Sequence, residues 1–474
     1  MLIGRQKEIQ RLENALNSGH SEFVAVYGRR RIGKTFLIKE TLGRKMVFFH
    51  SGLAHRDKKS QLAEFAKSLE LFGMKSSRRI RSWSDAFFAL QTGLGKCCSA
   101  RKVVFLDELP WMDTRKSDFV SALEHFWNGW CFMRNDIVLV VCGSATSWIV
   151  SKIIKNHGGL HNRLTDQIRL GAFDLSECEQ MARAKGLPYS RQQILEGYMV
   201  LGGVPYYWER LDKSKSIDQN IDWLFFGEDA PLGDEFDQLY ASLFANPAGH
   251  VKVVEALSTK KVGMTREEVI VSTKMDDNGA LTKVLAELAA CGFVRLYRSP
   301  GKKIRDTVYQ LIDNFTLFYY RFLSNGGNLS AGRWLSCAAS HERHVWNGLA
   351  FERVCLEHLP QIKAALGISG IRTDAYAWRR RGDREREGAQ IDLLISRADK
   401  SVNICEMKYA PSKYEMTAQE HDRMLHRRIA YVEDSGFTGS VFLTLVSPYG
   451  AKRNEYSNDV QSEVTLDDLF REYR

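Results

Sequence analysis

The chain has 474 residues, of which 44% are hydrophobic and 26% are charged, and at roughly 150 residues per domain its length predicts about three domains. This globular composition excludes disordered, collagen-like and disulfide-scaffold proteins. There are 67 lysines and arginines against 57 aspartates and glutamates, which gives a net charge of +10 and a pI of about 9.0. The positive balance favours polyanionic partners, namely nucleotides, nucleic acid or anionic membranes, while the many acids exclude a histone-like or ribosomal composition.

The sequence lacks several features that would place the protein in a membrane or outside the cell. No stretch approaches the ~18 uninterrupted apolar residues of a membrane span. The first five residues already include a charge and lack the apolar core of a signal peptide. The nine cysteines form no CxxC pair, and only Cys97 and Cys98 are adjacent. We therefore expect a cytoplasmic protein with reduced thiols, without a zinc site and without membrane contact.

The first third of the chain reads as alternating strands and helices. Short runs rich in Val, Ile and Phe are typical of parallel strands that are buried on both faces. Helical patterns lie between these runs. The predicted strands are residues 23–28, 46–49, 103–107, 137–143 and 167–170, and the predicted helices are residues 61–71, 84–94 and 119–130. We therefore predict an α/β domain with an open parallel sheet over residues 1–173.

The β signal fades after Asp174, which is placed to cap the N-terminus of a helix, so a helical lid is predicted over residues 174–245. Residues 246–312 give three helical stretches and then a hairpin, the order of a winged helix-turn-helix. A linker is predicted over residues 313–345 and a mixed α/β domain over residues 346–474. Within the winged helix, the third helix is predicted at 278–291 with its end at Gly292, the strands at 293–297 and 307–311, and the wing tip at 300–303.

A complete phosphate-loop motif, G-x-x-x-x-G-K-[ST], follows the first predicted strand and opens a helix. Its glycines let backbone N–H groups converge on nucleotide phosphates at a helix N-terminus. We expect Lys34 to neutralise the β- and γ-phosphates and the Thr35 hydroxyl to hold Mg²⁺. A chance glycine-rich turn is the weaker alternative, because the flanking strand and helix are both present. The predicted nucleotide-binding residues here are Gly28, Arg29, Arg30, Arg31, Ile32, Gly33, Lys34, Thr35 and Phe36.

Two adjacent acids stand at the end of the predicted strand 103–107. Asp107 is expected to bind Mg²⁺, directly or through water, and Glu108 to polarise the water that attacks the γ-phosphate. A solvated strand end is the simpler alternative.

Three further residues are candidates for the same site, each with a simpler alternative. Ser144 follows the strand 137–143, where a polar side chain senses the γ-phosphate, or it belongs to a plain Gly-Ser turn. Arg163 is an arginine finger or a surface arginine. Pro205 ends a Gly-Gly-Val-Pro sequence, which is either a rigid turn near the adenine or an ordinary turn between helices.

Together with Gly-Arg-Gln-Lys-Glu at residues 4–8, the motifs at 28–35, 106–108 and 202–205 resemble those of the AAA+-like archaeal-type ATPases. These are relatives of the signal-transducing STAND ATPases and also occur in bacteria. The similarity covers about the first 245 residues. It implies ATP or ADP with Mg²⁺ as cofactors, and a central sheet whose sensor strand lies between the two Walker strands. It also implies a nucleotide clamped between the core and the helical lid, with residues 4–8 near the adenine.

The predicted winged helix has little chemistry for reading bases. Its recognition helix has a single basic residue, Lys283, accompanied by Asn278 and Thr282. Phosphate contacts position a protein on DNA without specifying sequence. In this ATPase class such domains also serve as packing modules between domains, so DNA contact and packing both remain open. The wing residues that could reach phosphates are Arg298, Lys302, Lys303 and Arg305.

The last domain holds a second candidate site of three acids and a lysine. Asp392 lies in a predicted strand, and a hairpin brings it alongside Glu406 and Lys408, which share one face of the next strand. Glu352 lies on an upstream helix predicted at 346–359. This spacing resembles the PD-(D/E)xK nuclease fold of restriction-endonuclease-like and Holliday-junction-resolvase-like proteins. It also resembles the C-terminal domain of unknown function that often accompanies these ATPases.

Metal chemistry would suit these residues. Asp392 and Glu406 would hold Mg²⁺, Glu352 would support it, and Lys408 would orient or deprotonate the attacking water. The motif departs from the family, because Ile391 stands where its proline is expected. The alternative is that the two strand acids cap strand ends and Lys408 pairs with Glu406. The basic run at residues 378–384 is predicted as an exposed hairpin tip facing a phosphate backbone.

We therefore predict a Mg²⁺-dependent ATPase whose nucleotide state moves a lid, a winged helix and a nuclease-like domain that acts on nucleic acid. The alternative is a STAND-like nucleotide switch that signals through protein contacts without nuclease activity, and a weaker one is a DNA-binding regulator working through the winged helix alone. The expected macromolecular partners are DNA, a protein partner or further copies of the chain. The predicted catalytic residues are Lys34, Glu108, Arg163, Asp392, Glu406 and Lys408.

Overall fold

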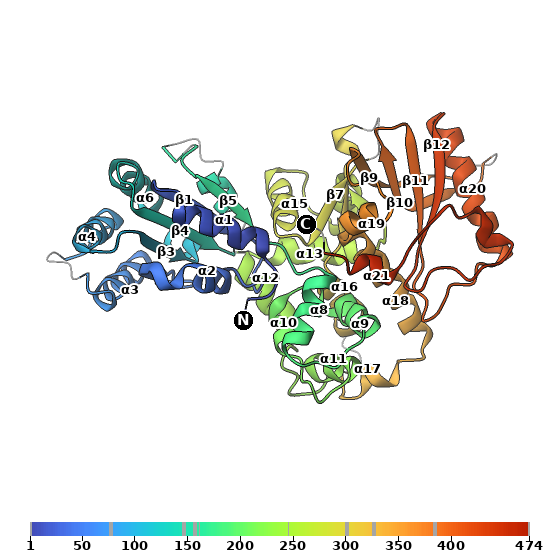
Figure 1. The fold of residues 1–474 in the computed structure, drawn as a ribbon, viewed down its shortest axis with the longest axis horizontal. Helices are drawn as coiled ribbons and strands as arrows, with labels where there is room; N and C mark the ends of the chain where they lie inside the picture. The colour runs from blue at the N-terminus through green and yellow to red at the C-terminus, as the bar shows by residue number, and fades with distance from the viewer. Residues whose placement is uncertain are drawn as a thin grey trace. The chain divides into compact units, whose positions relative to one another are not determined.

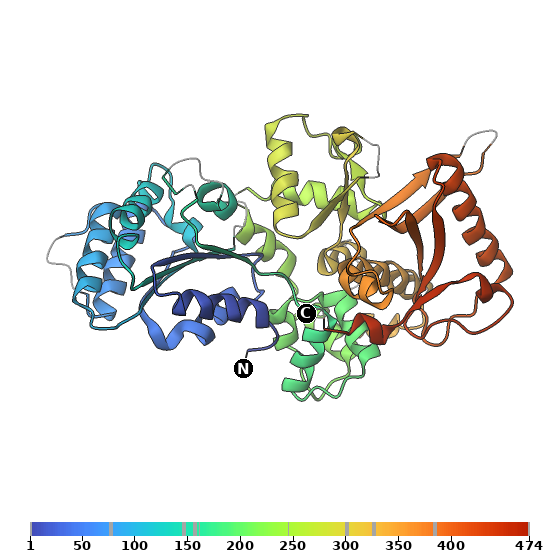
Figure 2. The ribbon, with the colours of Figure 1, turned by 45° about the horizontal axis from the view of Figure 1, so that its top comes forward.

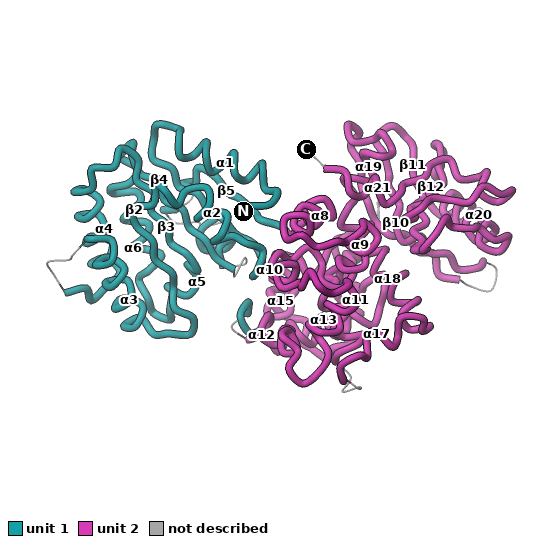
Figure 3. Tube along the Cα trace, turned by 60° about the horizontal axis from the view of Figure 1, so that its bottom comes forward, with its two compact units in different colours: residues 1–171, 241–245 teal, residues 172–240, 246–474 magenta. Residues whose placement is uncertain are grey.

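The computed structural model describes residues 2–74, 79–144, 148–154, 159–160, 162–244, 246–298, 303–324, 329–382 and 386–472. Two compact units divide the chain, as Figure 3 shows in two colours. The first unit comprises residues 1–171 and 241–245, and the second comprises residues 172–240 and 246–474. Among the described helices, none is long and apolar enough to span a membrane. All nine cysteines are free in the structure.

The first unit is built on five parallel strands in the order β2–β3–β4–β1–β5 (Figure 1). This confirms the predicted parallel α/β sheet. It also confirms the expected strand order, because β4 lies between β3, which ends in Asp107, and β1, which leads into the phosphate loop. The strands are β1 (Glu22–Tyr27), β2 (Met46–Ser51), β3 (Lys102–Asp107), β4 (Ile137–Gly143) and β5 (Asp166–Arg169).

Helices cover both faces of this sheet. Successive side chains along a strand point to opposite faces, and in β1 both sets are mainly apolar. Phe23 and Ala25 of β1 belong to one cluster with the apolar side chains of α3, α4 and α6, whereas Val24 and Val26 pack with α1 and α2 on the other side. Near-continuous apolar strands are therefore buried on both faces. The helices are α1 (Gln6–Asn17), α2 (Lys34–Leu42), α3 (Lys58–Leu71), α4 (Trp83–Lys96), α5 (Leu109–Met112) and α6 (Phe119–Phe126), with a 3-10 turn at Gly43–Lys45 and π-helical turns at Trp127–Cys131 and Ile149–Ile154.

One buried titratable group in this unit makes its stability depend on pH. The His50 ring lies edge-on to Phe65 at 4.9 Å between centroids, and its Nδ1 bonds to the Ser68 hydroxyl at 2.9 Å. Its Nε2 is buried without a hydrogen-bond partner among the described residues. Burial lowers the pKa of His50 from 6.5 to about 4, because the charged imidazolium is poorly solvated there.

The lowered pKa predicts that acid destabilises the first unit. Below pH 6.5 the unfolded chain takes up a proton at this histidine that the folded chain does not, until the pH approaches 4. At pH 5 the loss is about 2 kcal/mol of unfolding free energy. Urea unfolding at pH 7.5 and pH 5.0 measures it, and the His50→Gln variant should lose about 2 kcal/mol less than the wild type between the two pH values. Equal pH dependence in both proteins would contradict the assignment.

In the second unit, residues 172–240 form a helical segment. Asp174 caps α8, as predicted, and accepts a hydrogen bond from the Glu177 backbone N–H at 2.9 Å. Residues of the predicted linker pack against this segment. Phe315 stacks on Phe225, with their ring centroids 5.5 Å apart. The helices are α8 (Leu175–Ala184), α9 (Arg191–Leu201), α10 (Pro205–Glu209), α11 (Ile217–Phe225), α12 (Glu235–Leu243), α16 (Asn314–Phe318) and α17 (Arg333–Ser336), with a π-helical turn at Tyr319–Leu323. The last residues of α12, 241–243, are counted with the first unit.

Residues 248–311, here called the α13–β8 module, hold three helices and a three-stranded antiparallel sheet in the order β6–β8–β7. The predicted order of helices and hairpin is present, and Gly292 follows α15 with a φ of 79°, a left-handed backbone suited to glycine. The predicted wing residue Lys302 lies outside the described residues. The elements are α13 (Ala248–Ser258), β6 (Met264–Thr265), α14 (Arg266–Thr273), α15 (Gly279–Ala290), β7 (Val294–Tyr297) and β8 (Val308–Leu311), with a 3-10 turn at Ile304–Asp306.

Residues 341–472, here called the C-terminal sheet domain, hold a mixed five-stranded sheet in the order β13–β12–β11–β10–β9. β9, β10 and β11 are antiparallel to one another, whereas β11, β12 and β13 are parallel. α20 packs on one face, and Figure 2 shows it running beside the strands. The elements are α18 (His341–Glu357), α19 (Leu359–Ala365), β9 (Thr373–Arg380), β10 (Ala389–Arg397), β11 (Ser401–Met407), α20 (Ala418–Ser435), β12 (Ser440–Val446), β13 (Ser462–Val464) and α21 (Leu466–Leu469), with a 3-10 turn at Tyr456–Asp459.

The prediction of an exposed basic hairpin tip at residues 378–384 is wrong for its first half. Trp378 is a core residue of β9 and packs edge-on against Tyr431 at 5.6 Å. Arg380 is the last residue of β9 and pairs with Glu433 at 3.1 Å. The apolar packing of the tryptophan extends the strand further than the run of arginines suggested. Arg384 lies outside the described residues.

Candidate functional site

The phosphate loop connects β1 to α2 at the C-terminal edge of the parallel sheet. Two of its positions require glycine. Gly33 has a φ of 84°, and it precedes the first residue of α2. A Cβ on Gly28 would lie 2.2 Å from the carbonyl oxygen of Leu170, so a side chain there would force the backbone apart. The loop therefore has the tight conformation that its motif predicts.

Lys34 is the first residue of α2, and its side chain is folded back over the loop. Its Nζ donates hydrogen bonds to the carbonyl oxygens of Gly28 at 3.1 Å and Arg29 at 2.8 Å. The residue is only 6% exposed, although it carries a charge. The loop carbonyls hold the ammonium at the start of the helix, within the turn where phosphate oxygens would be bound.

Four side chains, from the ends of two strands and from α2, form a connected polar group. The Thr35 hydroxyl donates to Oδ2 of Asp107 at 2.7 Å, and Oδ1 of Asp107 accepts the backbone N–H of Glu108 at 2.9 Å. The Ser144 hydroxyl donates to Oε2 of Glu108 at 2.9 Å. β3 and β4 are neighbours in the sheet, so their ends place Glu108 and Ser144 side by side. The sequence prediction placed these residues in one site, and the structure brings them together.

This group has the ligands that Mg²⁺ prefers. Asp107 and Thr35 present a carboxylate and a hydroxyl oxygen within hydrogen-bond distance of each other, and hard oxygen ligands suit a magnesium ion that also binds phosphates. Glu108 has a left-handed backbone with a φ of 48°, a conformation that is uncommon outside glycine. Glu108 connects Asp107, the last residue of β3, to the first residue of α5. The residues present therefore fit a magnesium–nucleotide complex.

The remaining predicted loop residues differ in exposure. Ile32 is buried and packs with α1 and α2, whereas Arg30 is exposed. Phe36, the third residue of α2, is 45% exposed, which is unusual for a large apolar side chain. Arg31 has a φ of 71°, and Arg29 is buried.

Two other predicted residues are not joined to the loop by the described contacts. The guanidinium of Arg163 lies over the Phe132 ring at 5.0 Å, and its backbone N–H bonds to Leu160. Pro205 lies in the second unit, at the first position of α10, a position suited to proline. Gly203 precedes it closely, and a Cβ there would lie 1.8 Å from the carbonyl oxygen of Phe173. The Gly-Gly-Val-Pro turn is thus fixed by close backbone packing.

The C-terminal carboxylates form a different arrangement from the one predicted. Glu352 on α18 and Asp392 on β10 do approach each other, but a lysine lies between them. Nζ of Lys261 is 2.7 Å from Oε1 of Glu352 and 3.0 Å from Oδ2 of Asp392. Burial and the neighbouring Asp392 charge raise the pKa of Glu352 to about 7.

Glu406 takes no part in this contact. Leu393 pairs with Cys405 across β10 and β11, which places Asp392 and Glu406 next to each other in the register, as predicted. The Glu406 carboxylate nevertheless binds Arg427 of α20, and Lys408 lies 3.1 Å from its Oε1. In the described part of the chain, no three side chains of the metal-ligating kind form a cluster. The structure therefore does not gather the three predicted carboxylates into one cluster, and cations of the chain lie beside each of them. Metal binding by these acids stays a prediction.

Lys261 is the residue that sequence reasoning missed. It stands in a Lys-Lys pair after α13, and such a pair reads as a solvated turn. Only the packing of the α13–β8 module on α18 and β10 gives it two carboxylate partners.

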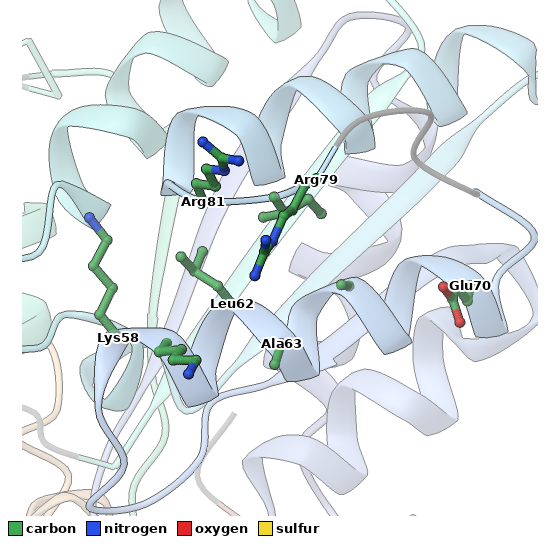
Figure 4. A pocket seen from close by; sticks show the side chains of 9 residues that line it. Lys58, Leu62, Ala63, Glu70, Arg79 and Arg81 are labelled. Atoms are coloured by element: carbon green, nitrogen blue, oxygen red, sulfur yellow. The ribbon is translucent and has the colours of Figure 1, made fainter.

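A hollow of about 780 Å³ lies beside α3 in the first unit (Figure 4). Its basic side chains include Lys58, Arg79 and Arg81, and its apolar lining includes Leu62. Lys58 is paired with Asp118 at 2.7 Å. None of the lining residues belongs to the predicted nucleotide site, so the hollow is separate from it.

Comparison with known proteins adds a family assignment for the first part of the chain. Residues 2–211 match the model of a family described as an ATPase domain predominantly from Archaea. An uncharacterized protein of Methanocaldococcus jannaschii, MJECL04, is 22% identical over 429 residues, which cover 87% of this chain and 88% of the relative. An uncharacterized ATP-binding protein of the same organism, MJ0423, is 40% identical over 47 residues, 10% of this chain and 80% of the relative.

Solved structures are similar at low sequence identity. The Walker-type ATPase PABY2304 of Pyrococcus abyssi has a TM-score of 0.49 at 15% identity, covering 68% of this chain and 96% of that one. The ORC2 protein of Aeropyrum pernix, in its ADPNP–ADP complexes, has a TM-score of 0.40 at 15% identity, with coverages of 67% and 93%. The family match, rather than these TM-scores, carries the assignment of residues 2–211.

Proposed function

Because residues 2–211 belong to the family of ATPase domains found predominantly in Archaea, we propose that the chain binds ATP at its phosphate loop and hydrolyses it with Mg²⁺. The observation that carries the proposal is the contact between Thr35 and Asp107 beside a complete loop motif. These two residues come from different elements, and they meet where a magnesium ion would bridge the protein and the nucleotide phosphates.

The contacts support a separate role for each residue. The backbone N–H groups of residues 28–36 bind the phosphates, and Lys34 exchanges its carbonyl partners for phosphate oxygens. Thr35 and Asp107 would hold Mg²⁺, which would supply positive charge beside the β- and γ-phosphates. Glu108 orients the attacking water, and Ser144 holds the carboxylate of Glu108 in place until nucleotide binds.

Three roles stay predictions that the described contacts do not address. Arg163 would act as an arginine finger, Pro205 would fix a turn near the adenine, and Phe36 would be one of the nucleotide-binding residues. Each of these three roles would be exerted only when a nucleotide is bound. Substitution of each by alanine, followed by ATP titration and turnover measurement, separates a part in binding from a part in catalysis.

The proposal is tested by magnesium dependence in the full-length chain. Purified wild type should release phosphate from ATP with Mg²⁺ and stop when EDTA removes the metal. Thr35→Val, which lacks the hydroxyl, should lose about tenfold or more of the Mg²⁺-dependent turnover while still binding metal-free ATP. Thr35→Ser keeps the hydroxyl and is the matched control, expected near wild-type turnover. If the wild type neither binds nor hydrolyses ATP at millimolar concentration, the proposed function is wrong.

A specific observation favours the second candidate function, a nucleotide switch without nuclease activity. The acids predicted to hold metal in the C-terminal sheet domain are paired with Lys261, Lys408 and Arg427. A divalent ion at these acids would have to displace positive charges already in place. We therefore infer that the C-terminal sheet domain responds to nucleotide through protein contacts in this conformation.

DNA remains a proposed partner of the α13–β8 module, on charge alone. Arg298, Lys303 and Arg305 are exposed beside β7 and β8, and such cations contact phosphates. Lys283, the one basic residue of α15, lies 3.9 Å from Glu287 on the same helix, which weakens its field toward DNA. The slope of binding affinity against salt concentration for the full-length chain and duplex DNA measures the number of phosphate contacts, and a flat slope would remove DNA as a partner.

A further inference from the structure

Lys261 lies between α13 and β6, and its backbone joins two parts of the second unit. Its carbonyl oxygen accepts a hydrogen bond from Nε2 of Gln310, on β8 of its own module, at 2.7 Å. The same oxygen accepts a hydrogen bond from the guanidinium of Arg353, on α18 of the C-terminal sheet domain, at 2.5 Å. Hydrogen bonds from the α13–β8 module and from the C-terminal sheet domain therefore both fix the backbone of Lys261.

The side chain of Lys261 makes the second connection. Its ammonium bridges Glu352 of α18 and Asp392 of β10, at 2.7 and 3.0 Å. Burial opposes the charge of Lys261, but the carboxylates of Asp392 and Glu352 outweigh it and raise the pKa of the lysine. Without a cation between them, the two carboxylates would repel each other in a half-buried site. The three side chains therefore form one electrostatic unit.

The carboxylate pair has features of a divalent-cation site. Oε2 of Glu352 is buried and has no hydrogen-bond partner in the part of the chain that the structure describes. Oδ1 of Asp392 accepts a hydrogen bond from Nε2 of Gln390 at 2.8 Å, which orients the carboxylate. Carboxylate oxygens are the ligands that Mg²⁺ and Mn²⁺ prefer. The lysine thus supplies one positive charge where a metal ion would supply two.

Two other cations lie near the pair, and the hydrogen bonds described for them are made to other groups, although Nε of Arg353 and one Nη of Arg295 have no described partner. Arg353 is buried and donates to the Lys261 carbonyl, and Arg295 donates to the side chain of Gln310 at 2.6 Å. Among the described contacts, Lys261 alone reaches both carboxylates. Its side chain is about one-third exposed, so it can leave without breaking the core of either domain.

We propose that Lys261 is a built-in cation that keeps divalent metal out of the Glu352–Asp392 pair and latches the α13–β8 module to the C-terminal sheet domain. A displacement of the module withdraws the ammonium and opens the pair to a metal ion. Metal binding by the C-terminal sheet domain is thereby made conditional on the position of the module.

Manganese binding to the full-length, nucleotide-free chain tests the latch. Electron paramagnetic resonance counts free Mn²⁺ during a titration of the wild type and of Lys261→Ala. The variant should bind one additional Mn²⁺ per chain, at least about tenfold more tightly than the wild type does at that site, because the competing charge is gone. Asp392→Asn in the Lys261→Ala background should abolish the gain, which separates this site from the one at Thr35 and Asp107.

Two matched variants complete the design. Lys260→Ala removes the neighbouring lysine, which pairs with Glu268 at 2.6 Å, and should bind manganese like the wild type. Lys261→Arg keeps the charge and should also show no gain. Circular dichroism confirms folding, and Lys261→Gln replaces the alanine variant if the latter unfolds. The proposal is overturned if neither Lys261→Ala nor Lys261→Gln gains a site, or if the gain survives Asp392→Asn.

Discussion

Replacing Lys34 by alanine is expected to lower ATP hydrolysis by at least about 100-fold and to weaken ATP binding, because hydrogen bonds to loop carbonyls hold its ammonium inside the phosphate loop. In the structure its ammonium bonds to the carbonyls of Gly28 and Arg29 and is almost fully buried. Alanine leaves those carbonyls without a donor and leaves the β- and γ-phosphates without a counter-charge. Steady-state phosphate release and titration with a fluorescent ATP analogue measure the two effects.

The matched control for this variant is Lys39→Ala on the same helix. Lys39 lies over the Phe49 ring at 4.8 Å and is exposed, more than one turn beyond the loop. It should retain turnover within about twofold of the wild type. Hydrolysis by Lys34→Ala at the wild-type rate would show that the phosphate loop is not the site of the chemistry.

Replacing Glu108 by glutamine is expected to separate ATP binding from hydrolysis. The carboxylate lies at the end of β3 and accepts a hydrogen bond from the Ser144 hydroxyl. Glutamine keeps the size of the side chain and removes its ability to accept a proton from the attacking water. Turnover should fall by about 10²- to 10³-fold, whereas the affinity for ATP should stay close to that of the wild type. Single-turnover hydrolysis and nucleotide binding measured on one preparation distinguish the two.

Asp113→Asn is the control for loss of a nearby negative charge. Asp113 follows α5 and accepts a hydrogen bond from the Trp148 indole at 3.0 Å. It should change turnover little. If Glu108→Gln hydrolyses ATP within about threefold of the wild type, another group activates the water, and the pairing of Glu108 with Ser144 is structural.

The first unit was predictable because its information is local. A buried parallel strand is a short apolar run, and the phosphate loop is a contiguous motif whose glycines are required by its own backbone, as Gly33 shows. Asp107 and Glu108 follow from the strand that precedes them. The parallel sheet then brings strand ends to one edge, so the contacts of Thr35 with Asp107 and of Ser144 with Glu108 agree with the expected site.

The second unit was less predictable because its decisive contacts are long-range. The order of helices and hairpin in residues 248–311 followed from periodicity and from Gly292. The extent of β9 did not, since the packing of Trp378 against Tyr431 outweighs the arginines that follow it. Aromatic packing likewise draws Phe315, from the predicted linker, onto Phe225 of the helical segment.

The sequence by itself determined the nucleotide chemistry of this chain, because a phosphate loop and a strand ending in two acids carry their geometry within a few residues. The charge excess of +10 favoured polyanions, and part of it serves the loop itself through Lys34. Only the tertiary structure decided what the C-terminal acids do. Lys261 and Asp392 are 131 residues apart in the chain, and no local pattern encodes that an ammonium will lie where a metal ion was expected. An ion pair is fixed by distance in space, and that distance is set when the α13–β8 module packs on the C-terminal sheet domain.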